Sequence, residues 1–412
     1  MKPEVLQEDL QICPNPTCNR ETGSELFCNA CGEGFCRCSQ CGAAVRLLAA
    51  YCRCCGYRLD LPRVCTEGSS LQAYRLAVPQ QLRPLWSDTV SSEIHVAPLA
   101  LSGLLVLVDT QGKIYLKRIA DGKTLRTYDL QGSVAACPAI DGNLRLFVAA
   151  DTMLYCIDLY GLLYGSVNEI IWKKQVLLPF KPILILLDKI LSIEATADRA
   201  ALLRIYRMGD AEQIAQLQVS TDGRVSKPVM LGAENSLIVM ITADGRILLL
   251  DLQHGQLLDA EHLRKPLDIS TLTAASSCFY FSSQDGQVWK GDLRESKLEL
   301  QLFAESGGVV SSLGSSDNYV AIGLGSGLVL LDRYARTCWQ TPLDGYPISS
   351  VFCAETFLMA VDNRGTLFVF DYGESVPRSR ARVGNLVLTP AFSDFVLVYV
   401  ETSGTVRALA CC

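Results

Sequence analysis

From about residue 82 onward, short apolar runs alternate with polar turns, and no helical period appears. The runs are rich in Val, Leu, Ile and Tyr, and Asp-Gly or Ser-Gly pairs separate them, as is typical of β-strands joined by tight turns. The turn glycines recur at steps of 41, 41, 38 and 39 residues, at Gly245, Gly286, Gly327, Gly365 and Gly404. Two positions after each glycine, an apolar residue begins a strand. The pattern predicts an all-β repeat.

The repeat extends toward the N-terminus. Gly112 fits the same frame, and the 133 residues from Gly112 to Gly245 hold three further steps. Two units in this stretch lack the glycine and centre near Asp151 and Asp198, where strand, turn and strand still follow one another. Eight units of about 40 residues result, and they begin near Pro98, Pro138, Pro182, Pro228, Ser270, Val309, Pro347 and Val387.

A unit of this length holds four short antiparallel strands, and units arranged radially form a β-propeller. The last unit, residues 387–412, has room for only three strands. Residues 82–96 form an extended segment without a unit of its own, so we expect them to pair with the C-terminal strands and close the ring. The prediction is a mainly β fold with an eight-bladed propeller over residues 82–412. Seven blades is the alternative, because the 160–200 stretch is irregular.

A cysteine-rich segment precedes the repeats, with 11 of the 18 cysteines in the first 65 residues. Eight of them form four close pairs: Cys13 with Cys18, Cys28 with Cys31, Cys38 with Cys41, and Cys52 with Cys55. Two short cysteine loops separated by a small β-hairpin supply four thiolates to a tetrahedral zinc ion without a hydrophobic core. We therefore predict two small zinc ribbons over residues 1–64, holding two structural Zn²⁺ ions, and a linker over residues 65–81.

The ligand set has open alternatives. Four residues separate Cys13 from Cys18 instead of the usual two, which makes Cys36 a candidate replacement ligand. Cys54 competes with Cys55, which is preferred because it reproduces the two-residue gap of the other pairs. Unmetallated or disulfide-linked thiols are the alternative to zinc. Paired thiols in a reducing compartment indicate metal more often than disulfide.

Composition indicates a folded protein with a large core, since 49% of the residues are hydrophobic. Residues 1–12 contain no apolar stretch of the kind found in secretory signals. The most apolar run, residues 176–187, is interrupted by two prolines and a lysine and is too short to cross a bilayer. We therefore expect a cytoplasmic protein without membrane insertion.

The net charge of −6 argues against nucleic acid as the main partner, because phosphate binding needs clustered Lys and Arg. The charge is uneven, since residues 1–35 are mainly acidic and residues 36–63 are mainly basic. Nucleic-acid association through the second ribbon is the first alternative function. Its candidate contacts with phosphates and bases are Arg46, Arg53, Arg58, Tyr51 and Tyr57.

The repeats "LIVMITADGRILLLDLQHGQLLD", "CFYFSSQDGQVWKGDL" and "FLMAVDNRGTLFVFDYG" resemble the PQQ-type quinoprotein propeller repeat. Trp86, Trp172 and Trp339 lie toward unit ends, where that repeat often carries Trp. The segments "FCNACGEGF", "CSQCGAAV" and "YCRCCGYRL" resemble the double zinc ribbon of many bacterial and eukaryotic proteins. The first resemblance implies a second alternative function, a quinone-dependent dehydrogenase. Such enzymes are exported and hold the quinone with calcium, acidic ligands and, in many, adjacent cysteines, whereas the adjacent Cys411 and Cys412 here end the sequence.

We predict no catalytic and no cofactor-binding residues. The three histidines lie near no recognisable nucleophile motif, and the glycine string at residues 323–327 is interpreted as a hairpin turn. Asp244, Asp285 and Asp344 are interpreted as turn formers. The cysteines expected in the core are Cys137, Cys156, Cys278, Cys338 and Cys353. The predicted function is a non-enzymatic protein–protein interaction scaffold, in which the ribbons dock and the propeller binds a protein partner that the sequence leaves unidentified.

Overall fold

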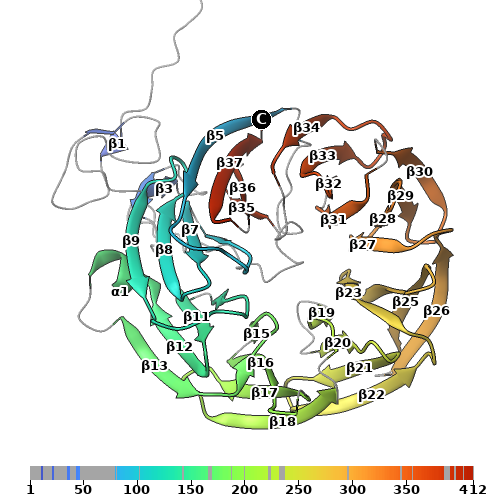
Figure 1. Cartoon of the computed structure of the whole chain (residues 1–412), viewed down its shortest axis with the longest axis horizontal. Coiled ribbons are helices and arrows are strands. Elements are labelled where there is room, and N and C mark those ends of the chain that lie inside the picture. Colours follow the sequence, from blue (N-terminus) through green and yellow to red (C-terminus); the bar gives the residue numbers. More distant parts are fainter. Residues whose placement is uncertain are drawn as a thin grey trace, which may run out of the picture.

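The computed structural model describes residue 79 and residues 81–411 with short gaps, together with four pieces nearer the N-terminus. These pieces are residues 11–12, 21–22, 35–37 and 43–46. The gaps within 81–411 are residues 102, 142, 166–168, 187, 199, 221–223, 232–236, 295–296, 344–345, 355, 385–389, 394–395 and 402. Over residues 81–411, eight β-sheets stand radially around a common axis (Figure 1).

The first four sheets follow one another along the chain, each with its first strand innermost (Figure 1). Blade one contains β6 (Leu99–Leu101), β7 (Leu104–Val108), β8 (Lys113–Arg118) and β9 (Thr124–Asp129). Blade two contains β10 (Ala139–Ile140), β11 (Arg145–Ala150), β12 (Met153–Asp158) and β13 (Ile170–Gln175). Blade three contains β14 (Leu178–Pro179), β15 (Leu184–Leu186), β16 (Lys189–Ala195), β17 (Ala201–Arg207) and β18 (Gln213–Ser220). Blade four contains β19 (Val229–Leu231), β20 (Leu237–Ile241), β21 (Arg246–Asp251) and β22 (Gln256–His262).

The other four sheets complete the ring. Blade five contains β23 (Leu267–Ala274), β24 (Cys278–Ser283), β25 (Gln287–Arg294) and β26 (Lys297–Glu305). Blade six contains β27 (Val310–Ser315), β28 (Tyr319–Leu324), β29 (Gly327–Asp332) and β30 (Thr337–Pro342). Blade seven contains β31 (Ile348–Cys353), β32 (Phe357–Asp362), β33 (Thr366–Asp371) and β34 (Ser379–Arg382). Blade eight contains β35 (Ala391–Ser393), β36 (Val396–Val400), β37 (Thr405–Cys411) and β5 (Leu82–Thr89).

The predicted eight-bladed propeller is confirmed, and seven blades is wrong. In blades one, two, four, six and seven, the first strand begins within one residue of the expected start. Blades three and five begin earlier than expected, at Leu178 and Leu267, and blade eight begins later, at Ala391. The irregular third unit is explained by its first strand, which is split into β14 and β15, both paired with β16.

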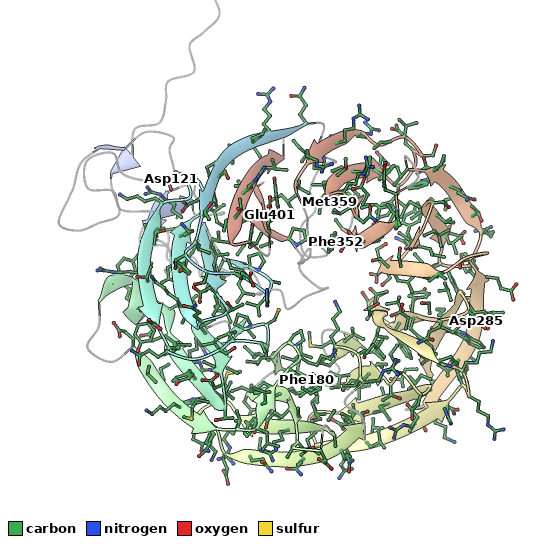
Figure 2. The ribbon with its side chains drawn as sticks, in the orientation of Figure 1. Asp121, Phe180, Asp285, Phe352, Met359 and Glu401 are labelled. Carbon is green, nitrogen blue, oxygen red and sulfur yellow. The ribbon has the colours of Figure 1, made fainter. Side chains whose placement is uncertain are left out.

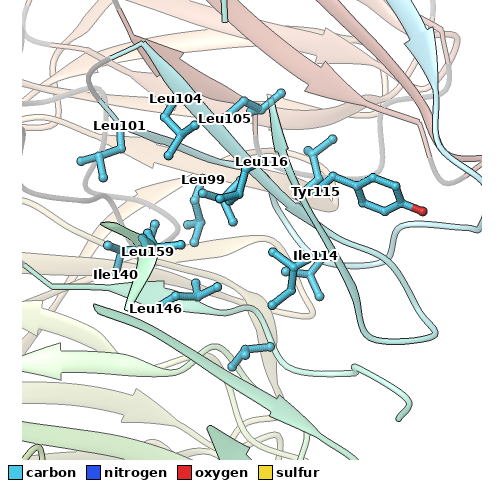
Figure 3. Close-up of a cluster of buried hydrophobic side chains, with 14 of the residues drawn as sticks. Leu99, Leu101, Leu104, Leu105, Ile114, Tyr115, Leu116, Ile140, Leu146 and Leu159 are labelled. Atoms are coloured by element: carbon cyan, nitrogen blue, oxygen red, sulfur yellow. The ribbon is translucent and has the colours of Figure 1, made fainter. Parts of the chain in front are cut away.

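Blade packing explains the alternation of apolar runs with mixed ones. The middle strands are covered on both faces by neighbouring blades, so all five residues of β7 are buried. The outer strand β9 has one face toward solvent, and only Leu125 and Tyr128 of its six residues are half-buried. One cluster of buried side chains joins blades eight, one and two, and Figure 3 shows part of it, including Leu99, Leu116 and Leu146. Side chains fill the spaces between the sheets around the whole ring (Figure 2).

β5 closes the ring, because it pairs antiparallel with β37 as the outer strand of blade eight. A buried lysine of blade one, Lys117, forms an ion pair with Asp88 of β5 and donates to the hydroxyl of Thr124 at 2.7 Å. The hydrogen bond from Lys117 lowers the pKa of Asp88 against the opposing effect of desolvation. The two ends of the propeller sequence therefore meet in one sheet, and a side-chain contact ties that sheet to blade one.

Five of the repeating glycines share one environment at the turn between the second and third strands. Their φ angles are 82°, 103°, 86°, 76° and 85°, at Gly112, Gly245, Gly286, Gly365 and Gly404. A Cβ at any of them would overlap a backbone carbonyl oxygen of the segment that leaves the outer strand. Each glycine carbonyl accepts a hydrogen bond from that segment, at 2.7 Å from Val383 to Gly365 and at 3.0–3.1 Å in the other four. Glycine recurs here because both the backbone angle and the close approach exclude a side chain.

Blade six departs from this pattern. Its turn consists of Gly325 and Ser326, and Gly327 is already the first residue of β29, opposite Leu324. The φ angle of Gly327 lies outside the left-handed region, unlike that of the other five glycines. A Cβ on Gly327 would still overlap the carbonyl oxygen of Thr341. Close packing is therefore sufficient to require glycine here.

One helix was not expected from the sequence. α1 (Leu159–Tyr164) lies between β12 and β13, and the side chain of Asp158 caps its N-terminus by accepting from the Tyr160 N–H. The residue after the helix, Gly165, has a φ of 80°. The helix has six residues, too few for a periodic pattern to be seen in the sequence. Among the residues that the structure describes, no helix combines the length and the apolar character needed to cross a bilayer.

The tryptophans at the unit ends join neighbouring blades. The indole Nε1 of Trp86, Trp172 and Trp339 donates to a backbone carbonyl of the next blade, at 2.6, 3.0 and 2.9 Å. Each tryptophan directly follows a β-bulge residue that has no partner across the sheet: Leu85, Ile171 and Cys338. The bulge bends the outer strand and directs the following side chain toward the neighbouring sheet.

Candidate functional site

The eight predicted zinc ligands, Cys13, Cys18, Cys28, Cys31, Cys38, Cys41, Cys52 and Cys55, all lie outside the described residues. Two hairpins beside them are described. β1 (Gln11–Ile12) pairs with β2 (Glu21–Thr22), and β3 (Phe35–Arg37) pairs with β4 (Ala44–Arg46). In the sequence, one cysteine pair lies between the two strands of each hairpin. The segments between the two pairs of each ribbon, where a hairpin was expected, lie mostly outside the described residues. The alternative ligand Cys36 is the central residue of β3, opposite Val45.

The cysteines of the propeller are mostly structural. Cys156, Cys278 and Cys353 are buried, and burial raises the pKa of the Cys156 and Cys353 thiols to about 12. Cys137 is half-buried, and Cys338 is exposed, so the expectation of a core position for Cys338 is wrong. Cys338 is the bulge residue of β30, where the extra residue turns outward. Within the described part of the chain, no three His, Cys, Asp or Glu side chains converge on a possible metal position.

The histidines and turn aspartates take part in local contacts. His95 lies 3.2 Å from Glu93, and His254 Nδ1 lies 2.6 Å from Asp251 Oδ2. His262 Nε2 lies 3.0 Å from a backbone carbonyl oxygen in the turn before β21. The turn roles of Asp244 and Asp285 are confirmed, because each accepts from the hydroxyl of the Thr or Ser two residues earlier. Asp344 lies outside the described residues.

One ionisable cluster is enclosed in blade three. Glu194 is fully buried, and it accepts from Tyr206 Oη at 2.7 Å and from the Leu177 N–H at 2.9 Å. Arg204 Nη1 lies 3.3 Å from the same carboxylate. Burial raises the pKa of Tyr206, and the hydrogen bond to Glu194 adds to the shift. These contacts satisfy the buried carboxylate and join β16 to β17, so the cluster stabilises the sheet.

Large exposed apolar side chains mark the surfaces on which the propeller can bind. Most lie on outer strands, and the loops carry the most exposed ones. The outer-strand group is Leu85, Ile171, Ile214, Leu257, Leu258 and Leu302, and the loop group is Val309, Tyr334 and Val376. Leu85, Ile171, Ile214 and Leu258 are bulge residues, so their exposure follows from the geometry of the outer strands.

Tyr334 has the most distinctive surroundings of this group. It lies in the turn between β29 and β30, and its side chain is 63% exposed. Arg333 donates to Tyr334 Oη at 2.6 Å, and its guanidinium carbon lies 4.8 Å from the ring centroid. The guanidinium carbon of Arg336 lies 5.3 Å from the same centroid. The sequence reasoning missed this turn, although "DRYART" places an aromatic residue and two arginines where a small polar turn suffices.

No family model matches the sequence, and no curated protein sequence matches it. Solved structures do resemble it, and those described below share little sequence with it. BamB from Moraxella catarrhalis is 17% identical with a TM-score of 0.62, covering 80% of this chain and 99% of that chain. Sqt1 from Saccharomyces cerevisiae is 13% identical with a TM-score of 0.59, covering 85% of this chain and 98% of that chain.

The quinohemoprotein alcohol dehydrogenase from Comamonas testosteroni also matches, at 11% identity and a TM-score of 0.60. The match covers 80% of this chain and 76% of the dehydrogenase. At these identities the comparisons establish the propeller fold, which different functions can share. The class of protein that fold and comparisons define is a β-propeller like those of BamB and the quinohemoprotein dehydrogenases, preceded by a cysteine-rich segment.

Proposed function

We propose that this chain is a non-enzymatic protein–protein interaction scaffold, with a zinc-ribbon docking module joined to a propeller that serves as a binding platform. The exposed side chains of the loops carry the proposal, above all Tyr334 and Val376, which are 63% and 70% exposed. Loops on a closed propeller vary without disturbing the strands that position them. Exposed aromatic and apolar residues beside arginines have the composition of protein-binding surfaces.

The docking module depends on metal. Cys13, Cys18, Cys28 and Cys31 would hold one Zn²⁺, and Cys38, Cys41, Cys52 and Cys55 would hold the other. The donor set fits, because eight thiols in four close pairs match two tetrahedral sites. The hairpins β1–β2 and β3–β4 support the assignment, since in the sequence one cysteine pair lies between the two paired strands of each. Bound zinc would supply the folding energy of a segment too small for its own core.

Charge reversal in the second ribbon tests the docking role. Its arginines Arg46, Arg53 and Arg58 would orient the module on an acidic protein surface. We expect the triple Arg→Glu variant to capture about ten-fold less of each partner protein than the wild-type chain does. Quantitative mass spectrometry of the captured proteins measures the difference. If every captured partner remains, the ribbon is not the docking element. Loss of nucleic acid in place of protein would favour the nucleic-acid function instead.

A further inference from the structure

One face of the ring differs from the rest at blades six and seven. Because neighbouring strands are antiparallel, the described connections between third and fourth strands open on the same face, and α1 is part of one of them. We call this face the α1 face. In four blades the turn ends in a residue with positive φ: Gly122, Ala211, Gly255 and Ala335. The backbone conformation at the end of the turn is therefore shared by these four blades.

The residue types at the tips of these turns are not constrained by the fold. The two residues at the tip are Ala120–Asp121, Gly209–Asp210, Gln253–His254 and Arg333–Tyr334 in blades one, three, four and six. Small, acidic, amide and imidazole side chains occupy the tips in the other three blades, so the turn geometry does not require Arg333 and Tyr334. A tyrosine held in the open between two arginines loses little conformational entropy when a partner covers it.

Blade seven departs from the others next to this turn. Its loop between β33 and β34, residues 372–378, is longer, and it presents Val376, the most exposed of the large apolar residues described. Side chains of blades six and seven contact each other below this loop. Trp339 donates to the Tyr372 carbonyl at 2.9 Å, and the rings of Tyr319 and Tyr372 stack with centroids 4.3 Å apart. The turn of blade six and the loop of blade seven therefore form one rigid surface on the α1 face.

On this surface the acidic side chains have ion-pair partners, whereas some of the arginines do not. Asp332 pairs with Arg336, and Asp371 and Glu374 pair with Arg378. Among the described residues, no carboxylate pairs with Arg333, or with the exposed Arg380 at the start of β34. The acidic groups are thus already neutralised, whereas Arg333, which contacts Tyr334, and Arg380, on the blade that carries Val376, have no carboxylate partner in the described part of the chain. A complementary ligand carries carboxylates next to an apolar side chain.

Building on the scaffold function, we propose that this surface binds an acidic segment of a partner protein. The carboxylates of that segment pair with Arg333 and Arg380, and its apolar side chain covers Tyr334 and Val376. Guanidinium groups bind carboxylates with two parallel hydrogen bonds, and the tyrosine supplies apolar contact area at low entropic cost. A nucleic-acid strand fits less well, because Asp332, Asp371 and Glu374 flank the arginines and the chain is acidic overall.

The test uses the full-length chain and a random peptide display library as the probe. We expect the selected peptides to carry carboxylates beside an aromatic or aliphatic residue. Their affinity, measured by fluorescence anisotropy, should fall at least about ten-fold in the double variant Arg333→Glu with Tyr334→Ala. It should also weaken with added salt.

Blade two, across the ring from blade six, offers a matched control (Figure 1). Lys173 and Tyr160 are an exposed cation and an exposed tyrosine there. The variant Lys173→Glu with Tyr160→Ala makes the same change of charge and should bind the peptides like wild type.

Equal loss in both variants, or selected peptides without carboxylates, would overturn the assignment while leaving the scaffold function intact. Displacement of the peptides by a single-stranded oligonucleotide would assign the surface to nucleic acid instead. Failure to select any peptide would count against the scaffold function itself.

Discussion

At the scale of single residues, this fold depends on glycines for two separable reasons, backbone angle and close approach. Gly365 illustrates both, with a φ of 76° and the Gly384 carbonyl oxygen where a Cβ would stand. Gly307 has a similar φ of 68°, yet nothing lies within 4 Å of the position of its Cβ. The two residues therefore distinguish the cost of the angle from the cost of the overlap.

Gly307→Ala should lower the free energy of unfolding by about 1–2 kcal/mol, the cost of a left-handed angle for an L-residue. Gly365→Ala should lower it by roughly 1–3 kcal/mol more, because the backbone must also move away from the new methyl group. Urea denaturation of both variants, followed by circular dichroism, measures the difference. Equal effects would show that the segment at Gly384 yields without cost.

At the scale of elements, the outer strands hold the blades in place through bulges and the side chains that follow them. Trp86, Trp172 and Trp339 each reach a carbonyl of the next blade. Blade one uses a different side chain in the same way, because Arg126 Nε donates to the Leu163 carbonyl at 3.4 Å after the bulge at Leu125. The bulge is therefore the shared device, and the tryptophan is one residue type that uses it.

Trp339→Phe should lower the free energy of unfolding by about 1 kcal/mol more than Trp289→Phe does. Both substitutions remove the same volume, but only Trp339 donates a hydrogen bond to a neighbouring blade. The Nε1 of Trp289 is buried without a hydrogen-bond partner among the described residues, so its loss forfeits no such bond. Thermal unfolding of the two variants side by side gives the comparison. A larger loss from Trp289→Phe would contradict a role for the indole hydrogen bond.

At the scale of the whole molecule, the propeller is closed by its own sequence. β5 and β37 pair over seven residue positions, and the buried Lys117 contacts Asp88 from the neighbouring blade. The largest core cluster continues across this seam through blades eight, one and two. Because the ring is closed by its own strands and core, we expect its stability to be independent of the cysteine-rich segment, so the two parts should respond separately to metal removal.

Purified protein should contain about two zinc ions per chain by elemental analysis, and Cys28→Ser with Cys31→Ser should remove about one. A chelator should abolish zinc-dependent structure in the N-terminal segment, while the unfolding temperature of the propeller stays the same. Limited proteolysis together with calorimetry reads the two parts independently. Metal-free protein whose N-terminal segment still resists protease would disprove the zinc ribbons.

The propeller could be predicted from the sequence because the patterns that indicate its strands and turns are local. The spacing of the turn glycines and of the apolar runs predicted eight blades, and most first strands begin within one residue of the expected position. The shape of each hairpin is set by the φ preferences of a few residues, which a single sequence displays. The helix α1, the two-residue turn before Gly327 and the exposure of Cys338 were not predicted, since short elements and bulges leave no periodic trace.

The sequence by itself determined most of the strands and the number of blades, because the signals for both lie in neighbouring residues, and it predicts the pairing of the cysteines from their spacing. Only the tertiary structure decided which carbonyl each tryptophan reaches, which arginines remain unpaired and which apolar side chains stay uncovered. Those properties depend on the distance between adjacent blades, and residues 30 to 40 positions apart set it jointly. The surface formed by Arg333, Tyr334 and Val376 belongs to this second class.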